Sequence, residues 1–327
     1  MNFFPRLFLA QLFLWSFLLA QPKEPVVLLF AGDVTLDRHI DRVAGKDPEY
    51  LFRRWDVRPY DLFMVNLEHP ITTSSSSIPK EFNFKMHPKY LRTLQHAGIT
   101  MVNAANNHVA DFGLRGLYDT MHYLDSVGIG YVGIGKNLDE ARKPRIVELK
   151  GWRVGFLGYH GYGRFSATAK SAGVAPRVEQ HIVADVRKLK PQVDFLVVNF
   201  HWGVELADQP DEEQIRLAHR VVDAGADLIV GHHPHVLQGM ERYNGATIAY
   251  SLGNFVFGGN FRHTYETAVL KVVLSAGRPQ ITLVPVFVQE WQPHLADERT
   301  AKRVKDLVQQ RSAMFREPFP IALEVTE

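Results

Sequence analysis

The chain has 327 residues, of which 46% are hydrophobic and 22% are charged, and it contains no cysteine. This is the composition of a globular protein with enough apolar material for a large core. The formal net charge is +2 with the histidines neutral, so bulk electrostatics give no indication of a nucleic-acid partner. The absence of cysteine excludes disulfides, thiolate nucleophiles and thiolate metal sites, which leaves His, Asp, Glu and Asn as metal ligands.

The first 25 residues are predicted to lie outside the fold, as a signal peptide or an uncleaved N-terminal membrane anchor. Arg6 supplies a positive charge, and residues 7–20 are apolar apart from Gln11 and Ser16. An apolar run of about 14 residues is short for a membrane span and has the length typical of a secretory signal. We therefore expect an exported protein that is periplasmic, anchored in the cell envelope or extracellular, with one domain over residues 26–327.

From residue 26 onward, strand-like and helix-like segments alternate. Strands are predicted at 26–30, 62–68, 99–104, 194–200, 227–230 and 248–252, with hairpins over 145–159 and 268–288. Helices are predicted at 88–97, 114–127, 176–189, 210–224 and 295–314. The polar, low-complexity stretch 72–77 is expected to be an exposed loop. This alternation, with added hairpins, predicts an α/β sandwich with both parallel and antiparallel strands.

Several strand candidates run into side chains that can bind metal. These residues are Asp33, Glu68, Asn107 with His108, His201, and the group His232, His233 and His235. Ligands of open α/β sheets bind at the carboxyl ends of strands, so we expect these side chains to meet. Their oxygen and nitrogen atoms suit Mn, Fe or Zn. The set is larger than one four-coordinate ion needs, and it predicts one or two divalent metals, with a bridging carboxylate if there are two.

The sequence Gly231-His232-His233-Pro234-His235 is the densest part of this set. Imidazoles two residues apart, as at His233 and His235, can face the same ion. Gly231 is expected to let the chain turn out of the sheet, and Pro234 to stiffen the backbone between the histidines. A solvated, histidine-rich loop is the alternative for this segment alone, just as a turn or a core histidine is for each other residue. Their joint occurrence at strand ends favours the metal site.

The ordered motifs of the chain resemble those of CapA-type poly-γ-glutamate capsule-synthesis proteins, a family similar to the calcineurin-like metallophosphoesterases. The motifs are Gly32-Asp33, Asn66-Leu67-Glu68, Ala105-Asn106-Asn107-His108 with Asp111 and Gly113, His201-Trp202-Gly203 with Glu205, Gly231-His232-His233-Pro234-His235-Val236, and Ser251-Leu252-Gly253-Asn254-Phe255. The resemblance extends over about residues 26–288. It implies a four-layer α-β-β-α sandwich of mixed sheets, with a metal site along one edge of the paired sheets.

The resemblance also implies roles for individual residues. The implied metal ligands are Asp33 at the first metal, Glu68 as the bridging carboxylate, Asn107 and His201 at the second metal, and His233 and His235 from the histidine-rich loop. His108 matches the position that acts as general acid or stabilises developing charge in metallophosphoesterases. Asp111 would orient the His108 imidazole and fix its tautomer. Arg38, Glu205, His232 and Asn254 are expected to contact substrate or to support the ligands.

Two departures from the phosphoesterase pattern bear on the first metal. The phosphoesterases usually open with Asp-x-His, but Asp33 is followed here by Val34 and Thr35, so one imidazole ligand is missing. Glu68 stands where they carry an aspartate, which reshapes the bridge. The sequence leaves open which of His232 and His233 reaches the metal, and whether the site holds one ion or two.

These features support competing functions. The first is an exported metal-dependent hydrolase that acts on a phosphoester or a γ-glutamyl amide, linked to the synthesis, anchoring or processing of a poly-γ-glutamate-like capsule. The second is a non-catalytic, envelope-anchored accessory that binds or exports the polymer. A secreted phosphodiesterase is a further alternative. The expected partners are an anionic polymer or a small anionic substrate, and a capsule-synthesis membrane complex.

Overall fold

The computed structural model describes residues 23–37, 40, 47, 49–161, 163–258 and 264–321. The predicted signal peptide or anchor lies outside the described residues except for its last three positions, and Arg38 lies outside them as well. Within the described part of the chain, no helix has both the length and the apolar composition needed to cross a membrane.

The larger sheet contains eight strands among the described residues, in the order β16-β15-β14-β1-β2-β3-β4 with β13 paired to β1. Their bounds are β1 Val26–Thr35, β2 Leu62–Leu67, β3 Met101–Asn103, β4 Gly130–Val132, β13 Asn254–Phe257, β14 Tyr265–Leu274, β15 Gln280–Gln289 and β16 Gln292–Leu295. Strand β1 runs parallel to β2 and β13 and antiparallel to β14. The sheet is therefore mixed, as predicted.

The second sheet has six strands within the described ranges, in the order β11-β12-β10-β9-β7-β6. Their bounds are β6 Arg145–Leu149, β7 Trp152–His160, β9 Phe195–His201, β10 Leu228–His232, β11 Met240–Tyr243 and β12 Ala246–Ala249. A separate two-stranded sheet pairs β5, Ile134–Gly135, with β8, Gly173–Val174. Strands β9 and β10 are buried along their whole length, which explains why both are continuous apolar runs in the sequence.

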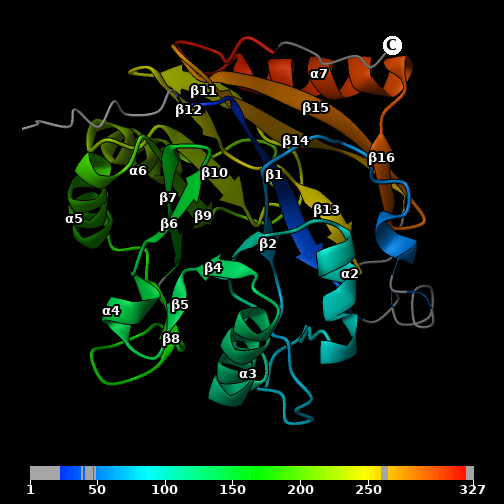
Figure 1. Cartoon of the computed structure of the whole chain (residues 1–327), viewed down its shortest axis with the longest axis vertical. Coiled ribbons are helices and arrows are strands. Elements are labelled where there is room, and N and C mark those ends of the chain that lie inside the picture. The colour runs from blue at the N-terminus through cyan, green and yellow to red at the C-terminus, as the bar shows by residue number, and fades with distance from the viewer. Residues whose placement is uncertain are drawn as a thin grey trace, which may run out of the picture.

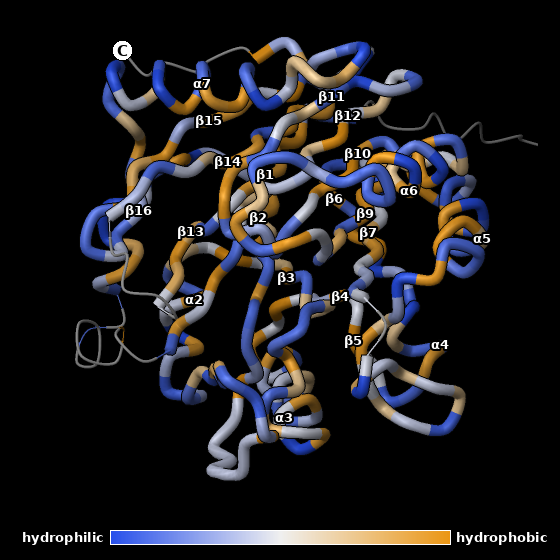
Figure 2. Tube along the Cα trace, turned by 180° about the vertical axis from the view of Figure 1, so that it is seen from behind, coloured by the Kyte–Doolittle hydropathy of each residue, from blue (hydrophilic) through white to orange (hydrophobic). Residues whose placement is uncertain are grey.

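Helices pack around the two sheets (Figure 1): α2 lies against the larger sheet, α5 and α6 lie against the smaller one, and α7 contacts strands of both. Their bounds are η1 Tyr50–Phe52, η2 Pro88–Tyr90, α2 Leu91–His96, α3 Gly113–Ser126, α4 Leu138–Ala141, α5 Glu179–Leu189, η3 Lys190–Gln192, α6 Glu212–Asp223 and α7 Glu298–Ser312. Local sequence fixes their starts where caps are present: the side chain of Asp211 accepts from the backbone N–H of Gln214 at the start of α6, and Gln214 reciprocates. Along helix α7, hydrophilic and hydrophobic residues are mixed (Figure 2), and the buried residues Ala301, Val304 and Val308 recur every three or four positions, as expected for a helix that packs on one face only.

Three large hydrophobic clusters define the layers. One lies between the two sheets and contains Phe30 of β1 and Phe156 of β7. A second joins the larger sheet to η1 and α2, and a third joins the smaller sheet to α5 and α6. Helix, sheet, sheet and helix therefore follow one another, and the predicted four-layer α-β-β-α sandwich is confirmed.

The structure adds elements that the sequence did not predict: the strands β4, β5, β8, β11, β13 and β16, and the short helix α4. Each is at most four residues long, which is too short for a periodic pattern to be read. Strand β12 ends at Ala249, three residues before the predicted strand end at Leu252. The loop 72–77 is largely exposed as expected, although Thr72 itself is buried.

Candidate metal centre

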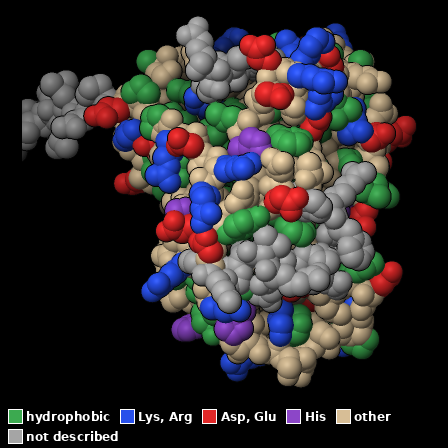
Figure 3. Space-filling view, turned by 90° about the vertical axis from the view of Figure 1, so that its right-hand side faces the viewer, with side chains coloured by type: hydrophobic (Ala, Val, Ile, Leu, Met, Phe, Trp, Pro, Cys, Tyr) green, Lys and Arg blue, Asp and Glu red, His purple; other side chains and the backbone are tan. Residues whose placement is uncertain are grey.

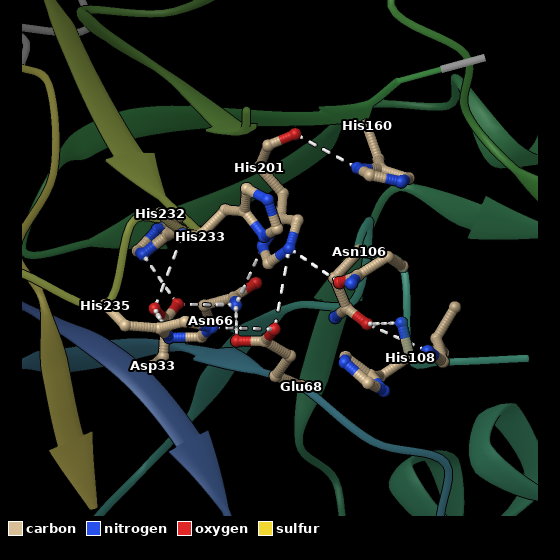
Figure 4. A network of polar contacts seen from close by, with 12 residues as sticks. Asp33, Asn66, Glu68, Asn106, His108, His160, His201, His232, His233 and His235 are labelled. Atoms are coloured by element: carbon tan, nitrogen blue, oxygen red, sulfur yellow. Dashed lines mark hydrogen bonds and ion pairs between the residues drawn. The ribbon is translucent and has the colours of Figure 1, made fainter. Parts of the chain in front are cut away.

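The strand ends converge as the sequence predicted (Figure 4). Asp33 pairs with Asn66 across β1 and β2, and Glu68 directly follows β2. His201 is the last residue of β9 and pairs in register with His232, the last residue of β10. The parallel strands that carry these residues end at one edge, so residues far apart in the sequence share one buried site.

The first set of donor atoms comes from Asp33, Glu68 and His235, whose possible ligand atoms all lie within 4.8 Å of one another. His235 Nδ1 lies 3.0 Å from Asp33 Oδ2, and His235 Nε2 lies 3.7 Å from Glu68 Oε1. We call these three residues the first donor group. Asp33 and Glu68 are the residues that the resemblance implied for the first metal and the bridge, and His235 is one of the ligands it implied from the histidine-rich loop.

The second donor group consists of Glu68, His201 and His233, again with ligand atoms within 4.8 Å. His201 Nε2 lies 3.6 Å from Glu68 Oε1 and 2.8 Å from Asn107 Oδ1, so the predicted asparagine ligand faces the same space. The rings of His201 and His233 have centroids 4.6 Å apart. Glu68 belongs to both groups, which is the position required of a bridging carboxylate.

The donor atoms fit a divalent cation. Glu68 Oε1 and His233 Nδ1 are buried, and neither has a hydrogen-bond partner among the described residues. A buried polar atom without a partner is costly, more so when it carries charge. Carboxylate oxygens, imidazole nitrogens and an amide oxygen are suitable ligands for Mn, Fe or Zn. A metal ion held by the carboxylate of Glu68 would satisfy its buried Oε1 atom.

The two carboxylates are equally buried, yet their pKa values move in opposite directions. For Asp33, burial favours the neutral acid, but the hydrogen bond and charge of His235 outweigh it and lower the pKa of the carboxyl. For Glu68, burial and then the nearby charge of Asp33 raise the pKa well above its usual value. Asp33 is therefore the more acidic of the two carboxyl groups.

The histidines divide in the same way. For His235, the charge of Glu68 and the hydrogen bond to Asp33 overcome the effect of burial and raise the pKa to about 10. Burial lowers the pKa of His233 to about 4 and that of His201 well below its usual value. The second donor group thus presents neutral imidazoles, the form that binds metal, whereas His235 is protonated.

The turn after β10 is made by the histidines themselves and not by Gly231. The expectation that Gly231 turns the chain out of the sheet is wrong, because β10 continues to His232. A Cβ atom at Gly231 would lie 1.8 Å from the carbonyl oxygen of Tyr250, so this glycine is required by close strand packing. His233 and His235 have φ angles of 100° and 60°. These left-handed conformations are uncommon for residues with a side chain and store strain at the site.

His232 and His233 have different surroundings. His232 Nδ1 is 3.7 Å from Asp33 Oδ1, and His232 is in neither donor group. His233 is in the second donor group and also clusters with His235 and the exposed Glu205. The geometry therefore favours His233 as the ligand and His232 as a supporting residue.

Asn254 supports His235 on the side facing β13. Its Oδ1 atom lies 2.9 Å from His235 Nδ1, the nitrogen that also faces Asp33. This contact places Asn254 beside the first donor group, in the supporting position that the sequence predicted.

Asn66 lies at the centre of the site, and the sequence predicted no role for it although it belongs to the Asn66-Leu67-Glu68 motif. Its Nδ2 donates to Asp33 Oδ1 at 2.8 Å and lies 3.2 Å from His201 Nδ1. Its Oδ1 accepts from Asn103 Nδ2 at 2.9 Å, which fixes the orientation of the amide. A signal was available: Asn66 and Glu68 are two residues apart and therefore face the same side of an otherwise apolar strand.

His108 and Asp111 form a close pair beside the second donor group. His108 Nδ1 lies 2.6 Å from Asp111 Oδ2, the arrangement predicted for an oriented imidazole. Burial lowers the pKa of His108 despite the hydrogen bond to Asp111. The backbone N–H of Phe84 also donates to Asp111 Oδ2, at 2.8 Å. Both oxygens of Asp111 are held in place, because its Oδ1 accepts from Lys80.

Lys80 is a second residue that the sequence did not indicate. Its Nζ lies 3.0 Å from Asp111 Oδ1, 3.0 Å from the carbonyl oxygen of Asn107 and 3.1 Å from His108 Nδ1. A single lysine after a polar loop gives no sequence signal, since such residues are usually solvated. Lys80 therefore ties the loop to the segment that carries Asn107, His108 and Asp111.

His160 extends the row of histidines at the strand ends. It is the last residue of β7 and pairs in register with His201 on β9. Its Nδ1 lies 3.0 Å from the carbonyl oxygen of His201 (Figure 4). An imidazole that donates from Nδ1 to this carbonyl keeps its other nitrogen as an acceptor. His160 was not among the predicted ligands and is in neither donor group.

Comparisons with known proteins agree with this architecture. The profile of the bacterial capsule synthesis protein family PGA_cap matches residues 27–259. The PGA biosynthesis protein CapA of Bacillus subtilis (strain 168) is 31% identical over 297 residues, which cover 86% of this chain and 78% of that protein. The capsule biosynthesis protein CapA of Bacillus anthracis is 32% identical over 287 residues, which cover 83% of this chain and 69% of that protein.

A solved structure supports the fold alone. A hypothetical protein from Thermus thermophilus matches with a TM-score of 0.50 and 17% identity, covering 80% of this chain and 100% of that chain. The sequence relatives carry the assignment further, because their similarity extends over most of the chain. The protein is therefore a member of the bacterial capsule synthesis protein family PGA_cap, to which its CapA-type motifs pointed.

Proposed function

We propose that this protein is an exported, metal-dependent hydrolase of the CapA type that acts in the synthesis, anchoring or processing of an extracellular anionic polymer. The observation that carries the proposal is the position of Glu68. Its carboxylate is shared by two donor groups, and its Oε1 is buried without a hydrogen-bond partner among the described residues. The His108–Asp111 pair then supplies a proton-transfer group beside the same site.

The residues that would hold metal are those of the two donor groups together with Asn107. A divalent ion bound there supplies Lewis acidity toward a phosphoryl or carbonyl oxygen. His108 would exchange a proton with the leaving group or the attacking water, while Asp111 keeps the Nδ1 proton on the far side of the ring. Glu68 and Asp33 balance the charge of the ion, and the strained turn holds His233 and His235 toward it.

The substrate class is drawn from the relatives. The Bacillus subtilis relative is named for PGA biosynthesis and the Bacillus anthracis relative for capsule biosynthesis. We therefore propose a γ-glutamyl amide of such a polymer, or a phosphoester of its precursor or carrier, as the bond to be tested. A capsule-synthesis membrane complex is the proposed partner, and the apolar stretch 7–20 supports export to the cell envelope.

A second candidate is a non-catalytic accessory that binds or exports the polymer. The first donor group favours it, because β1 carries Thr35 where the phosphoesterase pattern has a histidine. Asp33 in addition has both oxygens engaged, one by Asn66 and the other by His235. A weakened first metal would reduce hydrolysis and leave a binding site.

One experiment separates the two candidates. The purified full chain is loaded with Mn²⁺, its metal content is measured, and it is assayed on a phosphodiester and on γ-glutamyl oligomers. The hydrolase predicts turnover of one substrate that His108→Ala reduces by about 100-fold or more without loss of metal. Equal inactivity of the original chain and His108→Ala on both substrates, with metal retained, would leave the accessory function.

A further inference from the structure

A large cleft opens beside the candidate metal centre. It has a volume of about 920 Å³ and is lined at one part by His108, His235 and Asn254. The same side chains contact or belong to the metal centre, so the cleft is continuous with it. Pockets of several hundred Å³ with a few polar groups at one place are typical of small-molecule sites.

The remaining wall of the cleft is mainly apolar. It is built from side chains of β13, β15, α7 and the segment after β10, namely Phe257, Phe287, Leu307, Val236 and Leu237. Leu206 adds a further apolar side chain, 70% of which is exposed. The backbone of Leu206 has a φ of 60°, and its N–H donates to the carbonyl oxygen of Pro234 at 2.9 Å. The chain thus holds a leucine in a strained conformation at the cleft.

Charge in the described lining does not favour a polyanion. Arg311 is the one lysine or arginine among the described lining residues, and it is already bonded to Asp208 and to the carbonyl oxygen of Leu237. The lining also contains Glu205 and Glu266, of which Glu266 pairs with Arg303. A run of carboxylates placed along this wall would meet acidic and apolar groups, with no unpaired lysine or arginine among the described lining residues to balance it.

The face shown in Figure 3 carries Lys, Arg, Asp and Glu side chains interspersed with one another. The lining of the cleft itself points to the class of ligand.

We infer that the cleft binds the aliphatic portion of an amphiphilic ligand whose anionic head, a phosphate or a related group, lies at the metal centre. This inference rests on the proposed function for the position of the head group and deepens it by naming the substrate class. A lipid-like phosphoester fits both the polar end and the apolar wall of the cleft. Its head group would contact the donor groups and His108, and its tail would contact Leu206, Phe287 and Leu307. The polymer itself satisfies only the first part.

The test uses alkyl phosphonates, which cannot be hydrolysed at phosphorus, with chains from methyl to decyl below their micelle concentrations. Binding to the Mn²⁺-loaded full chain is measured by calorimetry. We expect affinity to rise about two- to fourfold per methylene over the buried part of the chain. Affinity that does not change with chain length, or a γ-glutamyl oligomer that binds more tightly than decyl phosphonate, would overturn the inference.

Variants locate the tail. Leu206→Asn keeps a residue that tolerates the left-handed conformation while removing the apolar side chain, and Leu307→Gln changes the α7 wall. Each should weaken decyl phosphonate about tenfold and leave methyl phosphonate unchanged. Val204→Asn is the matched control, because Val204 is 64% exposed, close in sequence and not part of the cleft lining. Equal losses for both phosphonates, or a loss in Val204→Asn as large as in Leu206→Asn, would contradict the assignment.

The outcome is separable from that of the proposed function. If the protein binds metal and its affinity rises with the length of the alkyl group but it hydrolyses nothing, the tail site stands and the proposed hydrolase activity is wrong. If it hydrolyses a methyl phosphodiester but its affinity for alkyl phosphonates does not depend on their length, the hydrolase activity stands and the tail site is wrong. When the series is repeated after metal removal, all affinities should fall, but the ratio of the affinity for decyl phosphonate to that for methyl phosphonate should stay the same. A loss of this ratio would contradict a tail site.

Discussion

The two donor groups share Glu68 but differ in what their other members do without a metal. In the first group, Asp33 and His235 already form an ion pair, with Asp33 Oδ2 and His235 Nδ1 3.0 Å apart. In the second group, His201 and His233 are neutral because burial lowers their pKa values, and His233 Nδ1 has no partner among the described residues. The first group is held together by an ion pair, whereas the second group consists of neutral imidazoles around the shared carboxylate.

This difference predicts two unequal metal sites. A cation at the second group meets neutral imidazoles, and it gains a buried Glu68 oxygen that has no hydrogen-bond partner among the described residues. A cation at the first group must also displace the proton of His235, whose pKa is raised to about 10. Displacing that proton at pH 7 weakens binding by up to roughly a thousandfold. The missing imidazole at Thr35 acts in the same direction.

Loss of the shared carboxylate should have the largest effect. Glu68→Gln keeps the shape of the side chain but removes the charge common to both groups. We expect metal affinity to fall by about a hundredfold or more at both sites, since even groups that merely support a ligand are worth 10–100-fold. Metal content after dialysis measures the loss. Glu205→Gln is the control, and an equal loss there would contradict the central position of Glu68.

The pH dependence should differ between the two sites. Because His235 must lose its proton, we expect the affinity of the weaker site to rise about tenfold per pH unit from pH 7 toward its pKa of about 10. The stronger site should change less over this range, because the low pKa values of His201 and His233 leave both imidazoles neutral at pH 7. Metal titrations at successive pH values between 7 and 9 measure both slopes, and parallel slopes would refute the assignment of His235 to the weaker site.

The metal-free protein should lose stability in mild acid. The pKa values of His160, His232 and His233 are lowered to about 4 by burial, whereas an unfolded histidine titrates near 6.5. Between these values the unfolded chain binds more protons, so the free energy of unfolding falls as pH falls, by roughly 1 kcal/mol per pH unit for each group. The raised pKa of Glu68 opposes this slope in part. Urea unfolding at pH 7 and pH 5 provides the check; unchanged or greater stability at pH 5 would contradict it.

Removal of the Lys80 side chain should have the smallest effect: it should lower turnover and leave metal binding unchanged. Lys80→Met leaves both donor groups intact but frees Asp111 Oδ1 and the carbonyl of Asn107. We expect kcat to fall on the order of tenfold, a fraction of what a general acid contributes, with metal content unchanged. Lys85→Met is the matched control, because Lys85 comes from the same loop but donates to Ser74. A similar fall in both variants would mean that the loop, and not Lys80, matters.

The sequence predicted the parts of the site that lie on long apolar strands. Asp33, Glu68, His201 and the residues after β10 were found because buried strands read as apolar runs and their ends stand out. Asn66 was missed because it lies inside such a run, where a polar residue was read as part of the strand. Its hydrogen bonds depend on the register between β1, β2 and β3, which one sequence does not reveal.

Other features depended on three-dimensional contacts that leave no local pattern. Lys80 reaches His108 from a loop, and nothing in its neighbours marks it. Gly231 was assigned to a turn, whereas its role is to let β10 approach the carbonyl of Tyr250. The apolar cleft combines side chains from β13, β15 and α7, whose adjacency follows only from the sheet order.

The most direct test of the unequal metal sites is a calorimetric titration of the metal-free chain with Mn²⁺ at pH 7. We expect two binding steps whose affinities differ by about a hundredfold or more. His201→Ala should remove the stronger step and His235→Ala the weaker one. Two equal steps, loss of the same step in both variants, or no binding at all would contradict an unequal pair of sites built around Glu68.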